Sequence, residues 1–237
     1  MTLMTQIDRR LQICADGGKR LWIFGSPKIH STTPVRVLLF AAYCSLLLVS
    51  LALSQKKQNQ ELVDIHSVNP AIVLDLRYAT ENNFTHHKLY AVAKCLLRRE
   101  PAESLSAVQK ELQTRGLGLK IFDGYRPLSV QKKLWEAVPD ARYVANPAKG
   151  SRHNRGAAVD LTLVDSLGNE LAMPTPFDSF TEKAHCNYKK LPRKILKNRA
   201  LLQQVMERHG FWRMETEWWH FDFHDWGRFK ILDLPLE

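Results

Sequence analysis

The pattern of apolar and polar positions beyond residue 61 alternates between helical and strand-like periods. Apolar residues three or four apart predict helices, over 102–116, 129–138 and 198–210. Alternating or short apolar runs predict strands, within 68–78 and at 119–122 and 219–223. Residues 159–171 are typical of a hairpin that turns at 166–169. Because strict βαβ alternation is missing, we expect an α+β fold with a mostly antiparallel sheet flanked by helices.

The first 54 residues differ from the rest in composition, because they combine a basic segment with a long apolar run. From Val37 to Leu53, seventeen residues carry no charge, and basic residues precede them. This run is longer than a usual signal-peptide core and shorter than a usual spanning helix. Small residues at Ala52 and Ser54 fit a signal-peptidase site. We therefore expect residues 1–54 to be a signal peptide, with export to the periplasm. An uncleaved membrane anchor facing the periplasm is the alternative.

Residues 55–237 are expected to form one domain, because no repeat or flexible linker divides them. The net charge of +10 is partly a property of the leader, since residues 55–237 hold 28 Lys and Arg against 22 Asp and Glu. The basic residues lack the aromatic platform of nucleic-acid readers, so we expect no nucleic-acid partner. Contact with a membrane is expected only through an uncleaved leader.

Two cysteines, Cys95 and Cys186, lie outside the leader. Two cysteines in an oxidising compartment often pair, so a Cys95–Cys186 disulfide is one interpretation. Two separate buried thiols are equally compatible with the sequence, because spacing along the chain does not report distance.

Candidate chemistry gathers in two short segments. The stretch SRHNRGAAVDLTL carries His153 and Asp160 among small residues, and TEWWH ends at His220. Two imidazoles and one carboxylate are the ligand set of catalytic zinc sites that keep one position open. Histidines packed beside tryptophans, and a capped turn leading into a core strand, are the plainer alternatives.

Two further residues have the chemistry of a hydrolytic site. Glu217 lies three positions before His220, where it could act as a general base. Because these two residues have opposite parity on a regular strand, we expect the strand to begin or bulge between them. Arg126, in DGYRP, could stabilise an oxyanion or hold a substrate carboxylate. It could equally pair with Asp123 within the turn.

The two segments resemble the paired zinc signatures SxHxxGxAxD and ExxH of the D-alanyl-D-alanine dipeptidases, within the wider zinc DD-peptidases. LRYATENNF, FDGYRP and TPFDSF add to the resemblance, which covers the chain from about Leu62 to the C-terminus. It implies a sheet that carries one Zn2+ per chain. The implied ligands are His153, Asp160 and His220.

The resemblance also implies roles for other residues. Glu217 matches the family's general base, and Arg126 matches the arginine that stabilises the reacting centre. Three residues match positions that line the dipeptide pocket: Ser151, Tyr78 and Asp178. Asp178 would face the free ammonium of the substrate. Pro174 departs from the family pattern, in which we expect a glycine, so the loop around it can differ.

The expected activity is zinc-dependent hydrolysis of the small dipeptide D-Ala-D-Ala to two D-Ala, by metal-activated water with a glutamate base. For an exported enzyme, recycling of cell-wall dipeptide fits better than a resistance role. A DD-carboxypeptidase or a peptidoglycan endopeptidase acting on larger muropeptides is one alternative. A non-catalytic zinc-binding module is the other.

Overall fold

A computed structural model of the chain describes residue 39 and residues 43–44, 46–50 and 60–237. The chain divides into two units, Met1–Leu48 and Val49–Glu237. Within the described residues, no helix is both long and apolar enough to cross a bilayer. The cleavage site expected after Ser54 lies outside the described residues, so the leader and its boundary stay predictions.

A five-stranded sheet forms the centre of the second unit, in the order β2-β4-β5-β7-β6. Its strands are β2 (Val73–Leu74), β4 (Leu117–Asp123), β5 (Ala158–Asp165), β7 (His220–Phe223) and β6 (Phe211–Arg213). Only β2 and β4 pair in parallel. A separate antiparallel pair joins β1 (Leu62–Asp64) to β3 (Leu96–Arg98). The expected mostly antiparallel sheet in a mixed α+β fold is confirmed.

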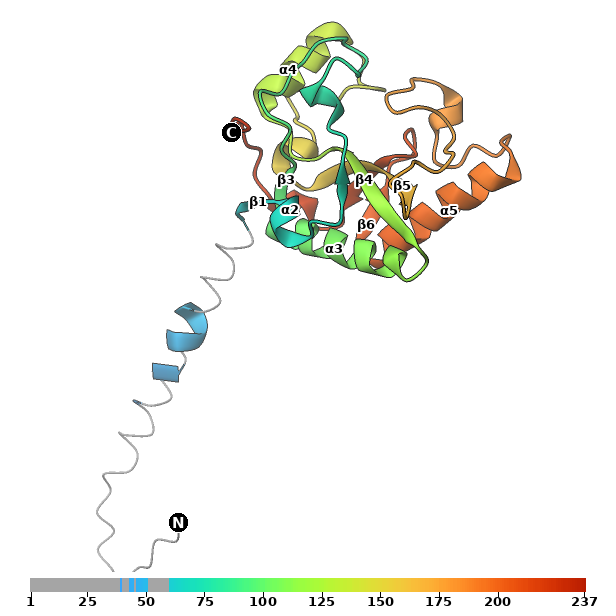
Figure 1. Cartoon of the computed structure of the whole chain (residues 1–237). Helices are drawn as coiled ribbons and strands as arrows, with labels where there is room; N and C mark the ends of the chain where they lie inside the picture. Colours follow the sequence, from blue (N-terminus) through green and yellow to red (C-terminus); the bar gives the residue numbers. More distant parts are fainter. Residues whose placement is uncertain (1–38, 40–42, 45, 51–59) are drawn as a thin grey trace, which may run out of the picture. The chain divides into compact units, whose positions relative to one another are not determined.

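Four α-helices accompany the sheet: α2 (Ile65–Val68), α3 (Arg99–Gln113), α4 (Leu128–Ala137) and α5 (Arg193–Arg208). Short 3-10 helices follow in the connections: η1 (Arg77–Ala79), η2 (His153–Arg155), η3 (Glu182–Ala184) and η4 (Trp226–Arg228). Helix α3 buries Leu105, Val108 and Leu112, the apolar spacing that predicted it. Helices α3 and α5 lie along one side of the domain, and α4 lies at the opposite end (Figure 1).

The structure corrects two of the expected strands. Within 68–78, the strand covers only Val73–Leu74, because η1 then turns the chain and buries Tyr78. The polar positions there form an ion pair between Arg77 and Asp75 at 2.8 Å instead of facing solvent along a strand. The turn after β5 is present, but its return touches β5 through one isolated bridge, Val164 to Glu170.

Strand β5 is the central strand, and its first seven residues are buried. It lies between β4 and β7, so both of its edges are hydrogen-bonded. The register places Asp160 of β5 opposite His220 of β7 and also opposite Asp123 of β4. Three polar side chains therefore form a row across three adjacent strands in the middle of an apolar core, an arrangement that is costly unless the charges compensate one another.

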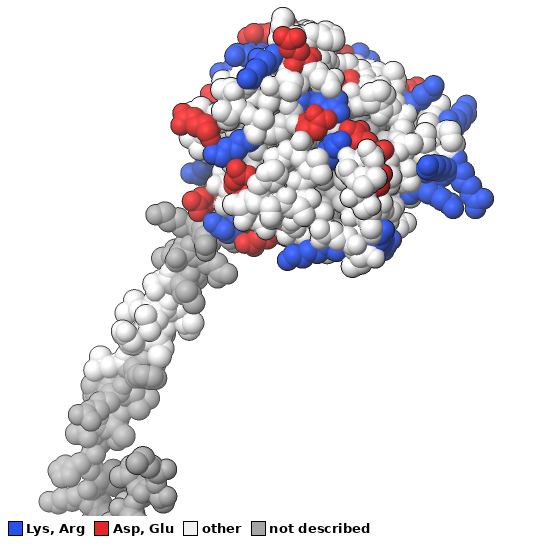
Figure 2. Space-filling view, in the orientation of Figure 1, with Lys and Arg blue, Asp and Glu red and all other residues white. Residues whose placement is uncertain are grey.

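Surface charge is mixed over the domain. Figure 2 shows acidic and basic side chains interspersed on the visible face, with Lys and Arg gathered at its right-hand edge. This agrees with the small charge excess of residues 55–237, which hold 28 cationic and 22 acidic side chains. Exposed charges beyond about 10 Å are largely screened at physiological salt. The electrostatics of the buried row therefore depend on its immediate partners.

Gly156 ends η2 with φ at 65°, in the left-handed region. A Cβ built there would lie 2.5 Å from Leu62 Cδ2 and 3.2 Å from the Arg98 nitrogen. This close approach lets β3 pack against the turn that carries His153, and the Arg98 amide donates to the Gly156 carbonyl at 2.8 Å.

We predict that Gly156→Ala lowers the free energy of unfolding by on the order of 2–4 kcal/mol, because backbone strain adds to steric overlap. Gly116→Ala is the matched control, since Gly116 has φ at 68° and nothing within 4 Å of a built Cβ. It should cost only about 1 kcal/mol. Urea denaturation measures both. Equal losses in the two variants would contradict the role given to the close approach.

Candidate active site

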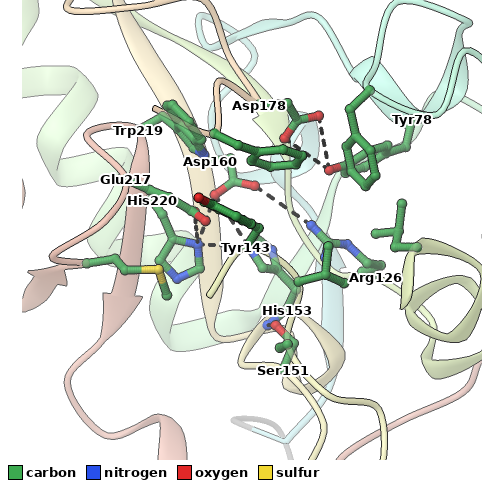
Figure 3. Close-up of a pocket in the computed structure, with 16 residues that line it drawn as sticks. Tyr78, Arg126, Tyr143, Ser151, His153, Asp160, Asp178, Glu217, Trp219 and His220 are labelled. Atoms are coloured by element: carbon green, nitrogen blue, oxygen red, sulfur yellow. Dashed lines mark hydrogen bonds and ion pairs between the residues drawn. The ribbon is translucent and has the colours of Figure 1, made fainter. Parts of the chain in front are cut away.

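The row of Asp123, Asp160 and His220 is contacted at its centre by a side chain from a segment outside the sheet. Helix η2 brings His153 against Asp160 and His220 (Figure 3). His153 Nε2 lies 3.1 Å from His220 Nδ1 and 3.4 Å from Asp160 Oδ1, and these last two atoms are 3.0 Å apart. The three side chains are buried. The structure thus brings together all three ligands expected from the sequence.

The outer nitrogen of each imidazole is already paired. His153 Nδ1 is 2.8 Å from the Gly124 carbonyl, and His220 Nε2 is 2.9 Å from Asp222 Oδ1. Because these partners accept hydrogen bonds, each ring carries its proton on the outer nitrogen when neutral and points a lone pair inward. Three acceptor atoms then face one another inside the protein, an arrangement that a bound cation stabilises.

The spacing of these atoms fits zinc. Ligands about 2.0–2.1 Å from a tetrahedral ion lie roughly 3.3 Å from one another, and the observed separations run from 3.0 to 3.4 Å. Among the described residues, this is the one group of three His, Cys, Asp or Glu side chains close enough to hold an ion. Burial opposes ionisation of Asp160, but His153 and His220 outweigh it and lower the pKa of that carboxyl.

Glu217 lies beside the three acceptors. Strand β7 begins at His220, as the parity of the two residues predicts, and Glu217 precedes it in an irregular segment. Its Oε2 is 3.8 Å from His220 Nδ1. Burial, together with the charge of Asp160, raises the pKa of Glu217 to about 7 although His220 opposes the shift. A carboxyl with a pKa near neutrality can both accept and return a proton.

Arg126 pairs with Asp123, as one of the two interpretations held, and its action on an oxyanion or a substrate carboxylate stays a prediction. Its Nε and Nη2 donate to Asp123 Oδ2 at 2.9 and 2.6 Å, and Nη1 donates to Gln131 Oε1 at 2.8 Å. Nη2 also lies 3.8 Å from Asp160 Oδ2. The guanidinium is therefore fixed in a buried position beside the candidate metal ligands. Arg126 and these three ligands line one cavity.

Tyr78 and Asp178 also line this cavity and meet each other there, with the Tyr78 ring centroid 5.0 Å from the Arg126 guanidinium carbon (Figure 3). The Tyr78 hydroxyl is 3.2 Å from both Asp178 oxygens. Asp178 has φ at 58°, a strained conformation for a residue other than glycine, of the kind found at functional sites. Burial, with a smaller contribution from Asp160, raises the pKa of Asp178. Ser151 also lines the cavity, and its Oγ accepts from the His153 amide at 3.2 Å.

Aromatic rings close much of the remaining wall: Phe84, Tyr143, Phe180 and Trp219. Tyr143 and Phe180 are 4.7 Å apart between ring centroids, and Phe84 packs edge-on against Phe180 at 5.3 Å. These residues were not among the site residues expected from the sequence, because aromatic residues in loops carry no spacing signal. They give this part of the cavity an apolar lining.

Two acidic residues that contact the site were also overlooked in this role. Asp123 was expected only as a turn partner, yet it fixes Arg126 and accepts from the Tyr90 hydroxyl at 2.6 Å. Asp222 was not identified, although residues two apart on a strand share a face, and it lies two positions after His220. That spacing is the signal that could have found it.

Cys95 and Cys186 are free thiols in the structure, so the disulfide considered between them is not formed there. Cys95 packs against Gly124, where a built Cβ would lie 2.7 Å from its Sγ. Cys186 lies elsewhere, with its amide donating to the Glu215 carbonyl at 2.9 Å. Burial raises the pKa of both thiols, which makes them poor nucleophiles.

Known proteins are similar to this chain over about two thirds or more of its length. D-alanyl-D-alanine dipeptidase of Escherichia coli is 38% identical over 172 residues, which span 73% of this chain and 89% of the relative. The protein of the same name from Enterococcus faecalis is 31% identical over 182 residues, or 68% and 86% of the two chains. A solved vancomycin resistance D,D-dipeptidase, VanXYg with a D-Ala-D-Ala phosphinate analog, aligns over 56% of this chain and 52% of that one. Its TM-score is 0.38 and its identity 20%, too distant to bear on the site.

The peptidase family M15 grouping described as D-ala-D-ala dipeptidase matches residues 58–233, which include every residue that lines the cavity. The resemblance noted in the two short histidine segments is thereby confirmed over most of the chain. The chain belongs to the D-Ala-D-Ala dipeptidase family of peptidases.

Proposed function

We propose that this protein is a zinc-dependent dipeptidase that hydrolyses D-Ala-D-Ala to two D-Ala. The observation that carries the proposal is the convergence of three acceptor atoms from His153, Asp160 and His220 beside the carboxyl of Glu217. A non-catalytic zinc-binding module would not need a glutamate carboxyl beside the metal site, 3.8 Å from His220 Nδ1. The names of the relatives from Escherichia coli and Enterococcus faecalis agree with the activity.

Zinc would be held by His153 Nε2, His220 Nδ1 and Asp160 Oδ1. When bound, zinc activates water at neutral pH and polarises the carbonyl under attack. Glu217 receives the proton of the attacking water and delivers it to the departing amine. Its position suits this exchange, because Oε2 lies 3.8 Å from His220 Nδ1, beside the place where the metal would hold the water.

Arg126 stabilises negative charge that develops on the carbonyl oxygen. Asp123 and Gln131 hold its guanidinium in place, so little reorganisation is needed as the reaction proceeds. Arg126 also partly balances Asp160, whose Oδ2 is 3.8 Å from Nη2. A lysine at this position would lack the planar fork that spans two hydrogen-bond partners.

Asp178 binds the free ammonium of the dipeptide. Among the described residues, no Lys, Arg or His side chain forms an ion pair with Asp178, and burial raises its pKa. A substrate ammonium would supply the missing cation. Tyr78 orients the carboxylate, and Ser151 lines the same pocket. A carboxypeptidase acting on longer peptides has no need of such a group, which favours the dipeptidase over the muropeptide-hydrolase alternative.

The dipeptide assignment is tested by hydrolysis of D-Ala-D-Ala, L-Ala-L-Ala and N-acetyl-D-Ala-D-Ala, each with and without a chelator. We predict turnover of free D-Ala-D-Ala alone, with loss in chelator and recovery on adding zinc. Preferential turnover of the acetylated substrate would support the carboxypeptidase alternative. Chelator-insensitive turnover would contradict the metal mechanism.

We predict that Glu217→Gln lowers kcat for D-Ala-D-Ala by about 10²–10⁴-fold, because the amide cannot accept the proton. Zinc content should stay at one ion per chain. Glu215→Gln is the matched control, because it removes the same charge from an exposed position two residues away. Wild-type kcat in the Glu217 variant would show that another group is the base.

We further propose that the enzyme is exported to the periplasm, where it recycles cell-wall dipeptide. Support comes from the uncharged run of residues 37–53 and from the small residues Ala52 and Ser54 at its end. We predict that the protein from the periplasmic fraction of a Gram-negative host begins at Gln55. A full-length protein in the membrane fraction would favour the anchor alternative, and a cytosolic full-length protein would contradict export and open a resistance role.

A further inference from the structure

The two histidines of the metal site differ in what lies behind them. The outer nitrogen of His153 faces a neutral backbone carbonyl, that of Gly124, at 2.8 Å. The outer nitrogen of His220 faces a carboxylate, that of Asp222, at 2.9 Å. His220 and Asp222 lie two residues apart on β7, so strand geometry sets this contact.

Asp222 is itself held by a cation. Its second oxygen, Oδ2, is 3.6 Å from Arg152 Nε. The Arg152 guanidinium carbon lies 4.7 Å from the centroid of the Trp226 ring, which restricts the side chain. Arg152 Nε is buried and has no hydrogen-bond partner in the described part of the chain, so its attraction to Asp222 is one of charge.

This contact joins two separate ligand segments. Arg152 immediately precedes the ligand His153 of η2, whereas Asp222 lies two residues after the ligand His220 on β7. The pair therefore ties the turn that carries one imidazole to the carboxylate that orients the other. Neither Arg152 nor Asp222 lines the cavity, so neither is placed to touch a dipeptide.

We propose that Arg152 and Asp222 are positioning residues that set the affinity of this site for zinc by acting on His220. A carboxylate that accepts from the outer nitrogen makes the imidazole a stronger donor and fixes the orientation of its ring. Arg152 keeps that carboxylate in place. The inference rests on the proposed zinc-dependent function.

The test measures the zinc dissociation constant of the purified protein by competition with a chromophoric chelator. Asp222→Asn keeps an acceptor of the same shape and removes the charge, and it should weaken zinc binding about tenfold. Asp222→Leu also removes the acceptor and should weaken it further, up to about 100-fold. Arg152→Gln should give a smaller loss, about threefold to fivefold, since it acts through Asp222.

Two controls separate this role from a general effect on the fold. Asp225→Asn removes one charge from an exposed position three residues along the chain and should leave zinc affinity unchanged. In the double variant Arg152→Gln with Asp222→Asn, the loss due to Arg152 should vanish, because its partner charge is gone. If Arg152 acted only on the stability of the fold, Arg152→Gln would weaken zinc binding by the same factor with or without the Asp222 charge.

Wild-type zinc affinity in Asp222→Asn, or an Arg152 effect that persists without the Asp222 charge, would overturn the inference. The wild-type protein distinguishes this failure from a failure of the proposed function. If the wild type binds zinc and hydrolyses D-Ala-D-Ala while the variants bind zinc equally well, only the positioning role is lost. If the wild type binds no zinc, the proposed function itself is wrong.

Discussion

Three lone pairs directed at one point are the constraint on which the rest of this structure depends. His153, Asp160 and His220 place their acceptor atoms within 3.4 Å of one another inside an apolar core. Without a cation, such an arrangement is repulsive and costly. The register of β4, β5 and β7 fixes two of these groups, and the glycine-terminated turn at η2 delivers the third. The fold therefore creates a position between these three atoms that favours a bound cation.

The carboxyl groups around that point divide into two kinds, according to their neighbours. Burial opposes ionisation of Asp160, but His153 and His220, which are positively charged when a proton takes the place of a metal on an inward nitrogen, lower its pKa. Glu217 and Asp178 also line the cavity, and there burial outweighs the opposing charge of Arg126, so their pKa values are raised. Environment therefore separates the carboxyl proposed as a metal ligand from those proposed to carry the proton and to bind the ammonium.

The helices and the start of β7 could be predicted from the sequence, because they depend on the spacing of residues close together in the chain. The periods of α3 and α5 predicted helices, and the opposite parity of Glu217 and His220 predicted where β7 begins. Contacts between distant segments could not be predicted in this way. Tyr90 reaches Asp123 across 33 residues, and Arg152 reaches Asp222 although β5, α5 and β6 lie between them in the chain. For the same reason the sequence left open whether Cys95 and Cys186 pair or stay separate, and the structure has them as free thiols.

The central claim is most directly tested by anomalous diffraction at the zinc edge from crystals of the zinc-loaded protein. We predict a single strong peak in each chain, about 2.0–2.2 Å from His153 Nε2, His220 Nδ1 and Asp160 Oδ1, with a solvent molecule completing the tetrahedron. A peak elsewhere, coordination through His220 Nε2, or a fourth protein ligand that closes the site would contradict the account.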